Sequence, residues 1–146
     1  MILPTNIGSD LSALVPACPV PAFEAGTCPA GTVIGSAIAT SPLLSAALAG
    51  PVVVVSNPSG LSRIGLDLLG QLHLQLFGNL VISAAGTGVE FAGLPDIPIA
   101  SFALKFSENR LVLNQVDLCD GAARIFTTEF LAHSGATLNG TKAATL

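Results

Sequence analysis

Hydrophobic residues in this chain recur in short alternating runs, and the longest run covers residues 63–82. Its apolar positions fall into two sets, 64, 66 and 68 and then 72, 74 and 76, with polar or small residues between them. A period of two predicts a half-buried antiparallel strand, because successive side chains of a strand point to opposite faces of its sheet. Gly70 and Gly78 interrupt the run and predict bulges or bends.

Further short strands are predicted between turn signals. Pro51–Ser56 contains four consecutive valines between Gly50 and Asn57-Pro58, which predicts a strand buried on both faces. Gly86-Thr87-Gly88 predicts a hairpin turn, since glycine adopts positive φ without a steric penalty. The other predicted strands are 32–40, 80–84, 89–91, 99–106, 111–116, 124–132 and 136–145.

These elements predict an all-β fold, an antiparallel two-sheet β-sandwich of about eight to ten strands. A closed barrel is the alternative. No segment of helix length has a 3.6-residue hydrophobic period, and 146 residues without an internal repeat indicate one domain, 1–146. Residues 1–31 are expected to be irregular and packed on this domain, because their five prolines exclude a long helix or a central strand. A single helical turn is predicted at 22–25.

The composition indicates that part of the surface of this protein is covered by other domains or chains. Charged residues make up 10% of the chain and hydrophobic residues 51%, whereas about 25% charge is usual. Neighbouring copies or other domains of the same protein are therefore the expected partners, and a homo-oligomer is one such form. A net charge of −4 with five scattered Lys and Arg argues against nucleic acid. The most apolar segments, 37–57 and 66–85, are interrupted by proline or polar residues, so the chain is not expected to span a membrane.

The three cysteines indicate in which kind of cellular compartment the protein resides. Cys18 and Cys28 flank a loop rich in proline and glycine, and in an oxidising compartment they are the expected disulfide. Three reduced thiols are the alternative. Cys119 is then free or paired with a cysteine outside the chain. A disulfide-stapled N-terminal segment predicts an extracellular or cell-surface protein, whose secretion signal is expected to be removed or to lie upstream.

No arrangement of residues predicts catalysis, a metal site or a cofactor. His73 lies on the polar face of a predicted strand and is expected to be a plain exposed residue, and His133 precedes a predicted turn. Asp117 and Asp120 are better explained as turn residues than as calcium ligands. No G-x-S-x-G motif occurs, and the absence of Trp and Tyr disfavours a carbohydrate site. The seven phenylalanines are expected in the core. The sequence therefore predicts a protein that is not an enzyme.

Several motifs along residues 3–140 occur together in one family. The matching segments are Ala17-Cys18-Pro19, Phe23, Cys28-Pro29-Ala30, Ile34-Gly35, Ser41-Pro42-Leu43-Leu44, Leu48-Ala49-Gly50-Pro51-Val52, Leu94-Pro95 through Phe106, Cys119-Asp120-Gly121 and His133-Ser134-Gly135-Ala136. Their order resembles a β-rich, Ig-like repeat module of large secreted actinobacterial surface proteins of uncharacterised function. The chain departs from that pattern at Val53-Val54-Val55, where the family often has an aromatic residue.

The resemblance implies an exported module without catalytic residues, present in several copies along a very long protein. A fourth cysteine often follows the last strand in that family, which implies that this chain is a fragment lacking the partner of Cys119. The predicted function is a non-catalytic structural or adhesive module that acts by protein–protein packing. One alternative is a self-assembling filament or coat subunit that uses edge-strand pairing. Another is a carrier that holds an apolar small ligand between its sheets.

Overall fold

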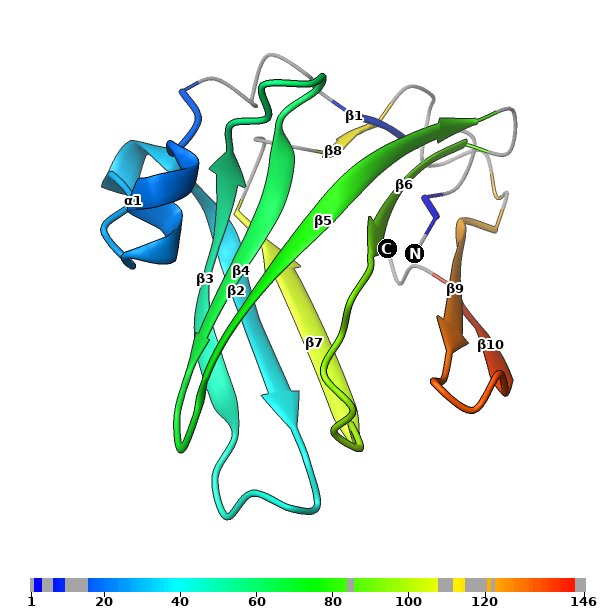
Figure 1. The fold of residues 1–146 in the computed structure, drawn as a ribbon. Coiled ribbons are helices and arrows are strands. Elements are labelled where there is room, and N and C mark those ends of the chain that lie inside the picture. The colour runs from blue at the N-terminus through cyan, green and yellow to red at the C-terminus, as the bar shows by residue number, and fades with distance from the viewer. Residues whose placement is uncertain are drawn as a thin grey trace.

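The main element of the protein is one six-stranded antiparallel sheet, which curls along its length (Figure 1). The computed structural model describes residues 2–3, 7–9, 16–83, 86–107, 112–114, 121 and 123–143. The strand order in the sheet is β6-β5-β4-β3-β2-β7. The bounds of these strands are β2 Val33–Thr40, β3 Leu48–Val55, β4 Arg63–Leu69, β5 His73–Ser83, β6 Gly86–Phe91 and β7 Ser101–Phe106.

Two small antiparallel sheets and a short helix accompany the main sheet. β1 (Ile7–Ser9) pairs with β8 (Val112–Asn114), and β9 (Ile125–Leu131) forms a hairpin with β10 (Thr137–Ala143). The helix α1 (Val20–Glu24) and the 3-10 turn η2 (Ala30–Thr32) lie between the first and second strands. The described residues confirm an antiparallel, almost entirely β fold. The packing of two sheets into a sandwich stays a prediction.

The inner face of the curled sheet carries the larger core. Residues that pair directly across neighbouring strands share a face, so the register places alternate residues of all six strands on this side. The buried members of this core are Ile34, Ala37, Ala39, Leu48, Val52, Val54, Ile64, Leu66, Leu68, Leu76 and Val89. Phe91, Leu104 and Phe106 pack against them while remaining partly exposed.

A second core lies on the outer face, where α1 covers the middle of the sheet. Val53 and Val55 of β3 point outward and are buried against Cys18 and Phe23. The inward and outward valines of β3 are therefore both buried, which confirms the prediction made from the run of valines. Not every phenylalanine is core, however. Phe102 and Phe130 keep 37% and 48% of their surface exposed, contrary to prediction.

The long alternating run of 63–82 is not one bent strand. It is two strands, β4 and β5, and the connecting turn contains Gly70. The alternating apolar residues stay on the same face of the sheet on both sides of the turn, because directly paired residues of the two strands share a face. Gly78 lies within β5, opposite Ile64.

Gly86 and Gly88 also differ from prediction, because they lie in β6 rather than in a turn. Gly86 has a φ of +127°, and a Cβ on it would lie 2.8 Å from the carbonyl oxygen of Leu3. The glycine is therefore needed for the close approach of the N-terminal segment as well as for its backbone conformation.

Candidate functional site

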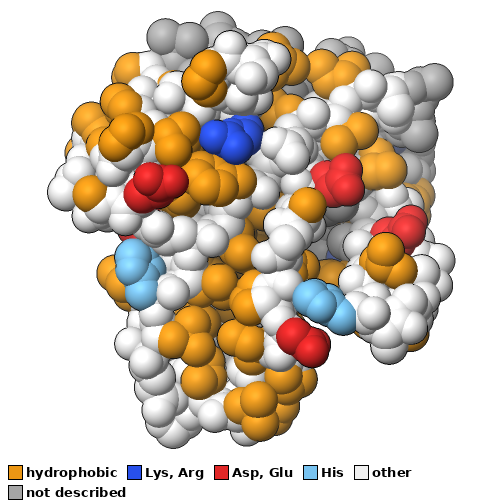
Figure 2. All heavy atoms as spheres, viewed as in Figure 1, with side chains coloured by type: hydrophobic (Ala, Val, Ile, Leu, Met, Phe, Trp, Pro, Cys, Tyr) orange, Lys and Arg blue, Asp and Glu red, His pale blue; other side chains and the backbone are white. Residues whose placement is uncertain are grey.

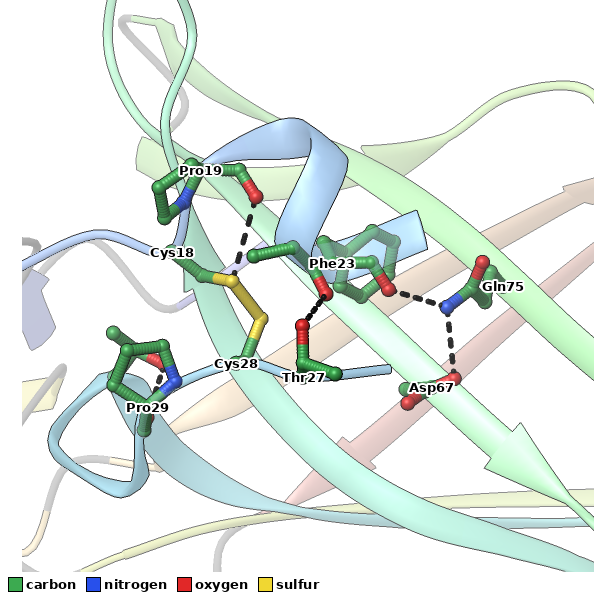
Figure 3. The surroundings of a disulfide bond; sticks show 10 residues. Cys18, Pro19, Phe23, Thr27, Cys28, Pro29, Asp67 and Gln75 are labelled. Atoms are coloured by element: carbon green, nitrogen blue, oxygen red, sulfur yellow. Dashed lines mark hydrogen bonds between the residues drawn. A yellow bond between two sulfur atoms is a disulfide. The ribbon is translucent and has the colours of Figure 1, made fainter. Parts of the chain in front are cut away.

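The Cys18 and Cys28 side chains lie at disulfide distance, as predicted, and they staple α1 to the outer face (Figure 3). Their sulfur atoms are 1.99 Å apart and their Cα atoms 5.4 Å. The Cys18 N–H donates to the carbonyl oxygen of Val54, and the Ser56 N–H donates to that of Cys18. The stapled segment therefore enters alongside β3 as a parallel bridge. Cys119 lies outside the described residues.

Phe23 is the side chain that α1 inserts into this face. Its ring centroid lies 4.9 Å from that of Phe77 on β5, and the two rings are tilted against each other. A Cβ on Gly65 would approach the Phe23 ring and a methyl group of Val55 to 2.6 Å each. Because residue 65 of β4 is glycine, the Phe23 ring can occupy the space where a side chain would otherwise lie. The packing of α1 on the sheet therefore depends on this glycine.

A polar cluster borders the Phe23 ring. The Gln75 amide donates to the Phe23 carbonyl oxygen over 2.6 Å and to a carboxylate oxygen of Asp67 over 3.1 Å (Figure 3). The same Asp67 oxygen lies 2.5 Å from Nε2 of His73. Asp67 pairs with Gln75 across β4 and β5, and His73 lies diagonally two residues away on the same face. The β4–β5 register therefore assembles the cluster.

This cluster connects α1 to the sheet through the Gln75 side chain. A carboxylate–imidazole pair serves catalysis when the imidazole also contacts a hydroxyl or thiol. Among the described residues, Asp67 is the only side chain hydrogen-bonded to His73. His73 is exposed as predicted, but its pairing with Asp67 was missed. The cluster could have been predicted by placing a hairpin turn at Gly70, because the resulting β4–β5 register brings the side chains of Asp67, His73 and Gln75 together.

Replacing Gln75 by Ala is expected to lower the free energy of unfolding by about 1–2 kcal/mol, because the Phe23 carbonyl and the Asp67 carboxylate each lose a donor in a partly buried site. Denaturant unfolding followed by circular dichroism measures the change. Asn79→Ala alters an exposed residue on the same face of β5 and serves as the control. Equal effects of the two substitutions would show that the bridge does not stabilise the fold.

The outer face also carries an exposed apolar row, beyond the part that α1 covers. Ala103 pairs with Ile38, Ile38 with Ala49, and Ala49 with Leu69, so the four residues form a line across β7, β2, β3 and β4. All four are exposed, Ile38 by 47% and Leu69 by 55%. We call these four residues the outer apolar row. At the strand spacing of about 4.8 Å, the row is about 14 Å long.

The remaining candidate residues do not form a site with this row. Nε2 of His133 lies 3.0 Å from the carbonyl oxygen of Leu94, so this histidine joins the β9–β10 turn to the segment that follows β6. Asp117 and Asp120 lie outside the described residues. Within the part of the chain that the structure describes, no three His, Cys, Asp or Glu side chains are grouped so that they could hold a metal ion.

The described residues contain no helix that has both the length and the apolar character needed to cross a membrane. Searches with protein-family models, curated protein sequences and solved structures found no match to this chain.

Proposed function

We propose that this chain is a non-catalytic structural or adhesive module of an extracellular or cell-surface protein, acting by protein–protein packing. The observation that carries the proposal is the outer apolar row. Its four side chains come from four adjacent strands and lie at one level of the sheet. Scattered apolar residues are normal on protein surfaces, but a contiguous line of them on a sheet face is typical of a surface that another layer covers.

The residues around the row support a packing surface. Thr40 and Ser101 lie on the same face beyond Ile38 and Ala103, and their hydroxyl oxygens are 2.5 Å apart. On the other side of the row lies Ser36, with Lys105 opposite it on β7. The row thus has uncharged neighbours along β2, Lys105 at its β7 margin, and the Asp67–His73 pair beside Leu69 at its β4 end. Figure 2 shows the same character on the face drawn there, where charged side chains are few among hydrophobic and uncharged ones.

The stapled segment supports the extracellular part of the proposal. Disulfides persist in oxidising compartments and are rare in reducing ones. Cys18 is fully buried beneath α1, and the pair closes the loop that holds Phe23 in the outer core. The resemblance to a repeat module of secreted surface proteins agrees with this assignment. The proposal also includes two earlier predictions: that two sheets pack as a sandwich, and that this module is one part of a longer chain.

Filament formation through edge strands receives less support. β7 is an edge of the main sheet, and Lys105 points outward near its end. β10 is the outer strand of its hairpin and carries exposed Lys142. Lysine on an edge strand is a common means of preventing edge-to-edge pairing. Packing through the outer apolar row therefore accounts for the surface better than edge pairing does.

Sedimentation velocity tests the proposal. We expect the wild-type chain to associate as its concentration rises, and Ile38→Lys with Leu69→Lys to weaken that association at least about tenfold, because two charges would have to be buried in the contact. Leu43→Lys places the same charge at a residue 71% exposed in the β2–β3 connection and is the matched control. A wild-type chain that stays monomeric throughout, or an equal effect of the control, would contradict packing between copies through this row.

A further inference from the structure

The outer apolar row alternates between small and large side chains. In order from β7 to β4 it consists of Ala103, Ile38, Ala49 and Leu69, and all four are exposed. In the opposite direction the order is large, small, large, small. A second copy that meets the row in the reverse direction therefore sets every large side chain against a small one. Facing sheets pack by this kind of interdigitation.

The charges beside the row follow the same reversal. Lys105 of β7 pairs with Ser36, and Ser36 with Pro51, so these residues lie two positions along the strands from the row. Asp67 precedes Leu69 by two residues on the same face, and because β4 is antiparallel to β3 it lies on the same side of the row as Pro51. A reversed second copy thus brings its Asp67 opposite Lys105, and its Lys105 opposite Asp67.

Two symmetric arrangements bring the rows of two copies face to face with their strands aligned, as packed sheets require to within about 30°. A two-fold axis along the strands reverses the row. A two-fold axis along the row keeps its direction, so Ile38 meets Ile38 and Ala49 meets Ala49, which leaves gaps between the small pairs. It also carries Lys105 to the opposite side of the row from Asp67. Size and charge therefore both favour the axis that runs along the strands.

The position of α1 is compatible with this arrangement. α1 covers the outer face beyond the row, where Phe23 lies over Gly65 of β4. In the reversed contact, β7 of the second copy lies over β4, and β7 ends at Phe106, close to where α1 begins. Because β7 is an edge strand, His73 of β5 lies beyond it. Figure 1 shows no other described helix or strand below α1 on this side of β3.

We propose that the outer apolar row pairs with the same row of a second copy about a two-fold axis that runs along the strands. The isoleucine and the leucine of each row pack on alanines of the other copy, and Lys105 of each copy lies opposite Asp67 of the other. Such an isologous contact closes after two copies, so it forms a dimer and not a filament. The inference rests on the proposed function, packing through this row, and names a second copy as the partner.

Exchanging the side-chain sizes at the two ends of the row tests the arrangement. Ala103→Leu sets two leucines against each other, and Leu69→Ala sets two alanines, so either substitution should weaken dimerisation at least about tenfold. The double variant again sets a large side chain against a small one and should dimerise within about threefold of wild type. Sedimentation velocity measures the Kd of each. Independent effects would instead multiply to a weakening of about a hundredfold.

Cross-linking locates the facing positions directly. In a Cys119→Ser background, chains with Leu69→Cys are mixed with chains with Ala103→Cys and treated with a short bismaleimide. The mixture should cross-link, because positions 69 and 103 of different copies face each other across the ~10 Å between packed sheets. Each chain alone should cross-link at least about tenfold less, since like positions lie at opposite ends of a row about 14 Å long.

Charge reversal completes the experiment. Lys105→Glu should weaken dimerisation at least about fivefold at low salt, because two carboxylates then face each other. Lys142→Glu makes the same change at an exposed residue of β10 and is the matched control. Cross-links between like positions, size effects that multiply, or equal effects of the two lysine variants would each overturn the two-fold pairing.

This pairing can fail while packing through the row stands. In that case the wild-type chain still associates and Ile38→Lys with Leu69→Lys still weakens the association, but the cross-links or the size exchange contradict the reversed arrangement. A wild-type chain that stays monomeric at all concentrations would overturn the pairing together with any packing between copies.

Discussion

Phe23→Ala is expected to lower the free energy of unfolding by about 3–5 kcal/mol, the usual range for truncation of a buried aromatic side chain. Phe23 is 1% exposed and contacts Phe77 and the outward valines of β3. Its removal leaves a cavity beneath α1 that the short, disulfide-closed loop has little freedom to fill. The loss therefore includes both the transfer free energy of the ring and the cost of the cavity.

Urea unfolding followed by far-ultraviolet circular dichroism measures this effect, since the chain has no Trp or Tyr whose fluorescence would report it. Phe130→Ala is the matched control, because Phe130 keeps 48% of its surface exposed on the β9–β10 hairpin. We expect that control to cost less than about 1 kcal/mol. A similar loss for both variants would mean that α1 is not seated through Phe23.

Replacing Cys18 and Cys28 together by Ser is expected to cost roughly 2–3 kcal/mol on the chain-entropy estimate for a short closed loop. The bonded residues are 10 apart in sequence, and one of them is completely buried. Without the bond, the unfolded chain gains conformational freedom. The α1 segment is then held by the Phe23 ring and the side chains that pack around it, by the Gln75 bridge and by the backbone bonds of Cys18.

The midpoint of denaturant unfolding, compared with and without a reductant, measures the contribution of the disulfide. Reduction should destabilise the wild-type chain by about as much as the double substitution does, and it should leave the doubly substituted chain unchanged. Cys119 remains in both chains, so any effect of its thiol appears in each and cancels. A wild-type midpoint that does not respond to reduction would contradict a stabilising staple.

The sequence was most informative about strands and least informative about their contacts. Alternation in 63–82 correctly indicated antiparallel strands, but it did not separate β4 from β5, and it did not indicate that β4 is buried on both faces rather than half-buried. The reason is that a strand and a tight hairpin have the same period, and only the pairing of Leu66 with Leu76 distinguishes them. Once that pairing is known, the contacts of Asp67 with His73 and Gln75 follow from the register.

By itself, the sequence determined the all-β antiparallel character, the burial of β3 on both faces and the pairing of Cys18 with Cys28. These properties depend on local patterns: side-chain period, a run of valines, and two cysteines close together in the chain. Only the tertiary structure decided that Ile38, Ala49 and Leu69 form one row and that Ile2 lies between β6 and β9. Residues so far apart in the chain meet through strand order and register. Both depend on how the whole sheet buries its apolar face, and no single segment encodes that.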